Sequence, residues 1–589
     1  MPLLRFPYRE AGLSDEEAAA HLLGRFTFGP TPGEVSRVAA EGLEAWFERQ
    51  LRAHAPDPEW DALSRSAPVV GLPATAVAAR LSSARRVRQL ALDAGAIDTL
   101  KPPKGDAQAW WERVRAFKQD EGLVTASEIA AAARRARIAR AAVGANQLHE
   151  VMAAFWANHL YVGATPASRP FLSAYDHEVI RPHALGAFPD LLAASARHPA
   201  MLFYLDNAAS SAPRGTPTAA PHLRGFGGRS RGFNENYARE LLELHTLGAD
   251  GPYAQSDVVD VARVLSGWAV LPQQHWHAGP SAWETLLEQT SPHRARYVLD
   301  GLFLFRADLH DATAKQVIGE RVPDGGGIEE GEQLLGRLAS HPATARHVCT
   351  KLARRFAADA PPEALVEPMA QAYAASGGDT KAVLRALAGA PAFWNEDVVR
   401  AKVRTPFEFV IAAARGTGAE LDFRNDLAGH LDALGEQPFG HTAPDGYPDH
   451  ASAWINAGTL LNRMRFGVDF ATGQLRGVRI APDRLVAAAG FNPADPADAL
   501  EAWLDALLAG RDLDPTRDLL QPVLEQEAYA ERIAAAAPPP TPASDDDLED
   551  EDEMAPTNGT RRRRRTRGPS SPAEQALSVV LGSPEFQRQ

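Results

Sequence analysis

Apolar residues recur at helical spacing along most of the chain, and capping signals open or close many of these runs. Ser14 and Glu17 form a capping box ahead of an apolar run that reaches Phe26, and Gly29 follows as a stop signal. Comparable runs occupy residues 126–160, 171–206, 330–416 and 453–466. A period near 3.6 residues is typical of α-helices, so the pattern predicts a mainly α fold, built as one large multi-helix globular body.

Three stretches interrupt this pattern. Residues 209–232 are rich in Ser, Pro, Gly and Arg, which predicts a mobile loop. Apolar residues on both sides of Asp300-Gly301 predict a small β-hairpin near 296–306, with little other strand. Residues 536–572 join prolines to an acidic and a basic block, which predicts a disordered insertion. The predicted organisation is a main helical domain over 1–535, this insertion, and a C-terminal helix over 573–589 that packs back on the main domain.

The densest run of polar residues at helical spacing is Asn234–Gly248, called the 234–248 helix below. A helix here places Asn236, Glu240 and Glu243 on one narrow face, beside an apolar stripe. His245 falls on the opposite side, where a packed or surface histidine is expected. A polar face next to an apolar stripe indicates either a solvated edge or a functional site.

Two carboxylates one turn apart can share a metal ion or a proton, so Glu240 and Glu243 are the first candidates for chemistry. The alternative is a capped helix with one surface ion pair, since Arg239 has the spacing to pair with Glu243. Asn236 adds an amide to the same face. The sequence leaves both interpretations open.

Other polar residues could complete such a site. His159 ends an aromatic-rich run, and His310-Asp311 follows the predicted hairpin, so each histidine could be a metal ligand or a general base. The predicted catalytic residues are Glu240, Glu243, His310 and Asp311. The predicted ligands of a divalent metal are His159, Glu240, Glu243 and His310. The polar cluster is expected to include Asp206, Asn207, Asn234, Asn236 and Arg239. The structural alternative is a set of packed histidines, turns and helix caps.

A polar and aromatic segment lies farther along the chain. Gln437-Pro438-Phe439 and Gly446-Tyr447-Pro448-Asp449 precede Trp454-Ile455-Asn456. This composition indicates a loop that covers a site, with a cap on the core as the alternative.

Composition narrows the classes of site and partner. The formal net charge of -14 argues against nucleic acid as the main partner. Cys349 is the single cysteine, which excludes a disulfide within the chain and a cysteine-rich zinc site. No apolar run reaches about 18 residues and no signal-peptide pattern opens the chain, so we expect no membrane span and a cytoplasmic location. The zinc-protease, phosphate-loop and nucleophile-elbow motifs do not occur.

Several segments together resemble the bacterial family called domain of unknown function 1800. The longest is 234–268, which carries the family's pattern Asn-Glu-Asn-x-Ala-Arg-Glu-Leu-x-Glu-Leu. The other segments that resemble the family, in chain order, are 21–30, 155–159, 201–207, His310-Asp311 with Lys315 and Gly319, 402–410 and 446–461. The resemblance implies a mostly helical protein. It also implies that the family's recurrent polar positions, which include Asp206, Asn207, Asn234, Glu240, His310 and Asp311, cluster around one site.

The residues and the resemblance leave three hypotheses open. The first is a metal-dependent or acid/base hydrolase whose site lies on the 234–248 helix. The second is a non-catalytic helical scaffold or accessory protein of a cell-envelope process, in which the same residues form a structural network. Family members are often exported and encoded near sulfatase-like proteins, which implies a sulfatase-like partner for that role. The third is a cofactor-binding protein in which Trp156, Trp268 and Trp454 line a pocket.

Overall fold

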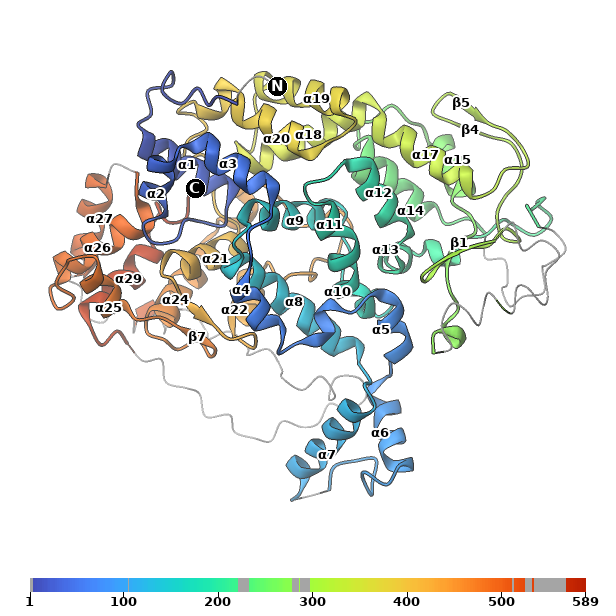
Figure 1. Ribbon diagram of the computed structural model, residues 1–589, viewed down its shortest axis with the longest axis horizontal. Coiled ribbons are helices and arrows are strands. Elements are labelled where there is room, and N and C mark those ends of the chain that lie inside the picture. The colour runs from blue at the N-terminus through green and yellow to red at the C-terminus, as the bar shows by residue number, and fades with distance from the viewer. Residues whose placement is uncertain are drawn as a thin grey trace.

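Helices carry most of the regular structure of the computed structural model (Figure 1). The structure describes residues 4–103, 105–220, 232–277, 285, 297–510, 513–524, 532–533, 536 and 568–589. The part of the predicted mobile loop at 221–231 and nearly all of the predicted insertion therefore lie outside the described residues. The predicted mainly α fold is confirmed.

The described part of the first half of the chain contains fifteen α-helices. They are α1 (Asp15–Phe26), α2 (Glu34–Glu41), α3 (Leu43–Arg52), α4 (Pro58–Ser64), α5 (Ala74–Arg80), α6 (Ala84–Asp93), α7 (Ala107–Asp120), α8 (Ala126–Val143), α9 (Gln147–His159), α10 (Leu172–Tyr175), α11 (Arg181–His183), α12 (Phe188–Arg197), α13 (Pro199–Tyr204), α14 (Glu235–Glu240) and α15 (Gln255–Val264). The Ser14–Glu17 capping box opens α1 as its sequence predicts.

The second half continues in the same style. Its helices are α17 (Ile328–Ser340), α18 (Pro342–Phe356), α19 (Glu363–Ser376), α20 (Thr380–Gly389), α21 (Pro406–Gly416), α22 (Leu427–Leu434), α23 (Ala451–Trp454), α24 (Ala457–Ala471), α25 (Pro482–Ala488), α26 (Pro496–Leu508), α27 (Asp514–Leu524) and α29 (Pro572–Leu581). The last of these packs against α24 and α26.

Strands are short and few. The predicted hairpin is present as β2 (Val298–Asp300) and β3 (Phe303–Phe305), with Gly301 at a φ of 58° in the turn. β1 (Trp268–Val270) joins the other edge of β3, so the sheet has three strands in the order β1-β3-β2. Two further antiparallel pairs, β4 (Lys315–Val317) with β5 (Glu320–Val322) and β6 (Glu420–Leu421) with β7 (Val478–Arg479), were not predicted. Strands of two or three residues are too short to produce a periodic signal.

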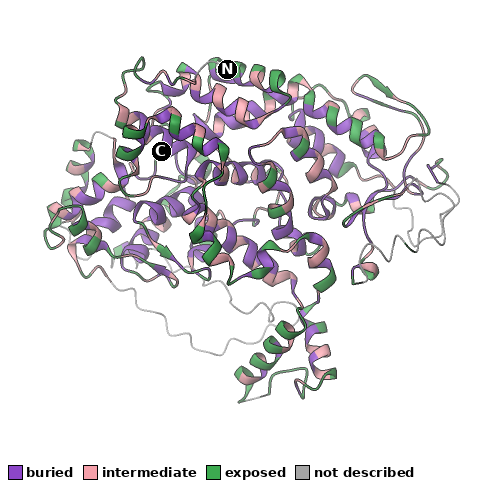
Figure 2. Ribbon diagram, viewed as in Figure 1, coloured by how far each residue is buried: buried purple, intermediate pink, exposed green. Residues whose placement is uncertain are grey.

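One continuous apolar core joins helices from both halves of the chain, as the buried inner faces in Figure 2 show. A second, small cluster lies between α6 and α7 and includes Val87, Trp110 and Val114. These two helices project from the body as a pair with its own interior (Figure 1). In the described part of the chain, no helix is both long and apolar enough to span a membrane.

Candidate functional site

The 234–248 helix changes its winding halfway along. It begins as α14, with the Asn234 side chain accepting a hydrogen bond from the backbone N–H of Asn236, and continues as a π-helix, η6 (Leu241–Thr246). The wider turn lets the Thr246 hydroxyl donate to the Leu241 carbonyl and Leu247 N–H to the Leu242 carbonyl. π-helical turns inside α-helices occur frequently at functional sites. The regular helical period of the sequence does not predict this change.

Two histidines cap the free carbonyls at the end of the π-helix. Nε2 of His159 lies 3.0 Å from the His245 carbonyl, and Nε2 of His347 lies 3.1 Å from the Leu244 carbonyl, which assigns the proton to Nε2 in both rings. His245 is itself buried, as expected for a packed histidine. Nδ1 of His159 and Nε2 of His245 have no hydrogen-bond partner in the described part of the protein. Burial, with the Lys351 charge nearby, holds the pKa of all three imidazoles well below the usual value.

The carboxylates of Glu240 and Glu243 are half-buried and make no hydrogen bond or ion pair with another described residue. Burial and the neighbouring Glu243 raise the pKa of Glu240. Arg239 pairs with Glu235 at 3.7 Å and donates to Gln255, so the pair with Glu243 that its spacing allows is not formed. The two carboxylates are therefore accessible to a partner from outside the chain.

The asparagines of the predicted polar cluster bond to the backbone. Asn234 donates to the Leu205 carbonyl at 2.8 Å, and Asn207 donates to the carbonyls of Leu265 and Trp268. Asp206, also predicted for the cluster, is exposed in a left-handed conformation with a φ of 59°. Asn236 is exposed as well. Asn207 and Asn234 thus join segments that are distant in the sequence.

His310 and Asp311 lie in a second polar group, beside the small sheets. His310 Nδ1 contacts the Ser266 carbonyl at 2.9 Å, and its Nε2 lies 3.5 Å from Glu330, which also binds Lys315. Asp311 pairs with Arg263 at 2.8 Å. Within the described ranges, no three His, Cys, Asp or Glu side chains are grouped so that they could hold a metal ion. The structure thus places Glu240, Glu243 and His159 on the 234–248 helix or at its end, and His310 and Asp311 in another network.

Loss of the Asn234 side chain should lower the stability of the protein. Asn234→Ala removes a helix cap and a partly buried hydrogen bond to Leu205, so we expect a loss of about 1–3 kcal/mol in the free energy of unfolding. Asn236→Ala is the matched control, because its exposed amide has no such tether. Chemical denaturation of the two variants measures the difference, and equal stabilities would contradict the structural role of Asn234.

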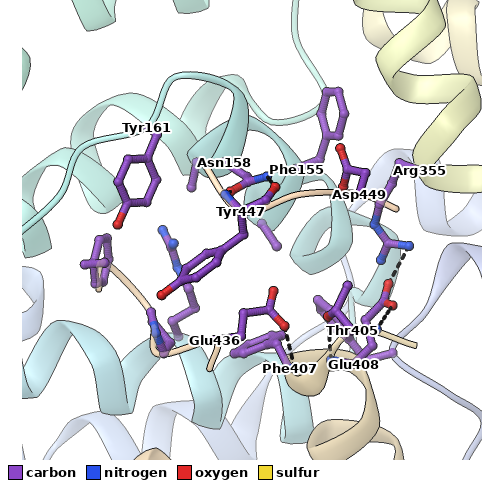
Figure 3. Close-up of a pocket in the computed structure, with 16 residues that line it drawn as sticks. Phe155, Asn158, Tyr161, Arg355, Thr405, Phe407, Glu408, Glu436, Tyr447 and Asp449 are labelled. Carbon is purple, nitrogen blue, oxygen red and sulfur yellow. Dashed lines mark hydrogen bonds and ion pairs between the residues drawn. The ribbon is translucent and has the colours of Figure 1, made fainter. Parts of the chain in front are cut away.

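A cavity of about 90 Å³ lies on the other side of α9, under the segment 436–449. Figure 3 shows side chains from α9, α18, the start of α21 and this segment converging on it. Its aromatic lining is Phe28, Phe155, Tyr161, Phe407, Phe439 and Tyr447, and its polar lining is Arg137, Asn158, Arg355, Thr405, Glu408, Glu436 and Asp449. None of Trp156, Trp268 and Trp454 lines it.

The segment 436–449 is fixed over the cavity by backbone hydrogen bonds. The Asn158 amide both donates to the Tyr447 carbonyl and accepts from the Tyr447 N–H, at 2.8 and 2.7 Å. The Tyr161 hydroxyl donates to the His441 carbonyl, and Gly446 packs so closely on Asn158 that no larger residue fits. Phe439 is held at a φ of 64°, under the Arg137 guanidinium. Such strain costs about 1–3 kcal/mol and is concentrated at functional sites.

Two carboxyl groups on this cavity have pKa values shifted in opposite directions. Burial raises the pKa of Glu436 to about 7. The hydrogen bond that its carboxylate accepts from Phe407 N–H lowers the pKa, but burial has the larger effect. Burial would also raise the pKa of Glu408, but Arg355 at 2.5 Å and the Thr405 N–H hold it below the usual value. Near pH 7, Glu436 therefore exchanges between its protonated and ionised forms, whereas Glu408 is an anion. Paired carboxyl groups with divergent pKa values are a pattern of acid/base sites.

The sequence signal for this cavity was partial. The segments 437–439 and 446–449 were singled out as a cover, and Asn158 adjoins the predicted His159. Glu436, Tyr161 and Arg355 were not singled out, because no motif connects α9, α18 and α22. Glu436 directly follows Gly435, which ends α22 in a left-handed conformation. A glycine that ends a helix is the one sequence signal next to Glu436.

Comparison with known proteins gives one result. The model of the family "Protein of unknown function (DUF1800)" matches residues 21–588. No curated protein and no solved structure matches the chain. Because the match covers nearly the whole sequence, the chain belongs to the DUF1800 family.

Proposed function

We propose that the protein is a hydrolase that uses acid/base chemistry in the cavity under 436–449. The observation that carries the proposal is Glu436, a carboxyl group whose pKa burial raises to about 7, on a cavity that also presents the carboxylate of Asp449. A general acid works best when its pKa lies near the working pH, which suits Glu436. The strained backbone at Phe439 supports a functional role for the segment that covers the cavity.

The residues divide the steps of hydrolysis between them. Glu436 gives its proton to the leaving oxygen or nitrogen as the bond to it breaks. Asp449, whose carboxylate has no hydrogen bond or ion pair to other described residues, accepts a proton from the attacking water. The Arg355–Glu408 pair is already satisfied, so its part is to fix the shape and field of the site. Proton exchange with solvent then restores Glu436 and Asp449.

Chromogenic substrates test the proposal. Wild-type protein should hydrolyse one of three classes, glycosides, esters or amides, and Glu436→Gln should lower the rate about 100-fold or more. Asp432→Asn is the matched control, because Asp432 is an exposed carboxylate one turn before Glu436. Carboxyl ¹³C NMR should show Glu436 titrating near pH 7. No turnover of any class, with Glu436 titrating near 4.5, would refute the proposal.

The Glu240–Glu243 pair is a second candidate centre, because both carboxylates lack partners in the described part of the protein. In the metal-dependent version the two carboxylates would hold a divalent ion without the predicted ligands His159 and His310, whose rings contact the carbonyls of His245 and Ser266. Loss of activity in Glu240→Gln but not in Glu436→Gln would move the chemistry to the 234–248 helix. Elemental analysis of the purified protein, with a stoichiometric metal lost in Glu240→Ala, tests the metal.

The scaffold alternative also rests on an observation. Asn207, Asn234, His310 and Asp311 are all engaged in contacts that join distant segments, which accounts for them without chemistry. In that role the protein is an accessory of a cell-envelope process with a sulfatase-like partner. Failure of all three substrate classes favours this alternative.

A further inference from the structure

The polar groups of the cavity under 436–449 are mostly hydrogen-bond acceptors. The hydroxyl protons of Tyr161 and Tyr447 are donated to the carbonyls of His441 and Gln437, so only oxygen lone pairs are left for a ligand. The Asn158 amide is engaged with Tyr447. Asp449 adds a carboxylate that accepts no hydrogen bond from the described residues and lies near the charge of Lys351. A ligand that satisfies this site must therefore bring several donors of its own.

The two cations on the cavity are already neutralised. Arg137 pairs with Asp176 at 2.7 Å while stacking on Phe439, and Arg355 pairs with Glu408. A carboxylate or phosphate of a ligand would thus find no unpaired cation among the residues that line the cavity, and it would face Asp449. The electrostatics of the cavity disfavour an acidic ligand.

The lining and size of the cavity limit the class of ligand further. Six aromatic side chains surround the polar groups, which suits a molecule with apolar C–H faces between its hydroxyls. A volume of about 90 Å³ accommodates roughly six waters, equivalent to about 180 Å³ of liquid. That is about the volume of one six-membered sugar ring with its hydroxyl groups.

We propose that the cavity under 436–449 binds one neutral sugar residue, whose hydroxyls donate to Asp449, Tyr161 and Tyr447 while its C–H faces pack on the aromatic lining (Figure 3). This inference rests on the proposed function and names its substrate class, a glycoside. In a glycoside, Glu436 would protonate the oxygen of the bond that breaks, and water would add at the sugar carbon. The sugar is distinguished from esters and amides by its hydroxyl donors.

Binding is measured separately from turnover. Saturation-transfer NMR and calorimetric titration of the full chain use methyl glucoside and methyl galactoside as neutral probes, with glucuronate and glucosamine as charged ones. We expect a neutral sugar to bind, glucuronate to bind at least about tenfold more weakly, and Asp449→Asn to weaken binding about tenfold. Asp432→Asn should bind as the wild type does. The Asp449 side chain makes no hydrogen bond with the described residues, so this variant should fold, and its melting temperature checks that.

The outcomes separate the inference from the proposed function. Sugar binding without hydrolysis by wild type or Glu436→Gln supports the inference and contradicts the hydrolase. Hydrolysis of esters or amides with no sugar binding supports the hydrolase and contradicts the inference. Tighter binding of glucuronate or of glucosamine than of the neutral sugars would overturn the inference, as would binding that Asp449→Asn leaves unchanged.

Discussion

Acidification from pH 7 to pH 4.5 should unfold the protein, because its interior holds histidines that resist protonation. Burial lowers the pKa of His21 and His245 to about 3 and of His347 and His430 to about 4. In the unfolded chain these groups titrate near 6.5. Between those values the unfolded state binds more protons than the folded state, so stability falls as the pH falls.

The size of the effect follows from the same linkage. Each such histidine costs about 1.4 kcal/mol per pH unit below 6.5, or roughly 3 kcal/mol at pH 4.5. Four of them cost on the order of 10 kcal/mol, which is comparable with the whole stability of a typical domain of 5–15 kcal/mol. The protonated Glu436 offsets only part of this loss, since its pKa shift has the opposite effect.

The contribution of one histidine, His245, is measured from the slope of the free energy of unfolding against pH. Denaturant unfolding at several pH values between 7 and 4.5 should give a smaller slope for His245→Gln than for the wild type. His54→Gln is the control, because His54 is exposed. A free energy of unfolding that stays constant over this range, with imidazole NMR signals titrating near 6.5 in the folded protein, would contradict the prediction.

Local patterns of the sequence predicted the elements well. The capping box at Ser14 and Glu17 opens α1, and the Asp300-Gly301 turn joins β2 to β3. Such signals lie within a few residues of each other, so one sequence suffices to detect them. The π-helical turn at η6 is different. It is stabilised by His159 and His347, which come from α9 and α18, and nothing inside 234–248 signals that support.

In the candidate site, too, local patterns are visible in the sequence and contacts between distant segments are not. The sequence leaves two interpretations of Glu240 and Glu243 open, a functional site or a surface ion pair with Arg239. In the structure both carboxylates are half-buried, and Arg239 pairs with Glu235 instead. The partners of Asn234 and His310 are backbone carbonyls of Leu205 and Ser266, and the sequence does not indicate these contacts because any residue can supply a carbonyl. A cavity built from segments that are distant in the sequence has no local pattern that a single sequence could reveal.

Glu436 should make stability fall as the pH rises, opposite to the histidines. Its folded pKa of about 7 exceeds the unfolded value of about 4.5, so the folded state binds the extra proton between those values. This contribution is fully present below pH 4.5 and is lost as the pH rises through 7, a change of roughly 3 kcal/mol. Glu436→Gln keeps the shape of the protonated form without titrating.

The histidines contribute equally to the pH dependence of stability in wild type and in Glu436→Gln, so their contribution cancels when the two proteins are compared. The free energy of unfolding of Glu436→Gln minus that of the wild type should increase by roughly 3 kcal/mol between pH 4.5 and pH 7. Asp432→Asn should show no such change, because its carboxylate is exposed. A difference that is independent of pH would mean that Glu436 ionises normally in the cavity, and it would then lose its role as the acid. If the difference has the expected size, hydrolysis should decline above pH 7 with the same pKa, because one proton governs both the stability and the rate.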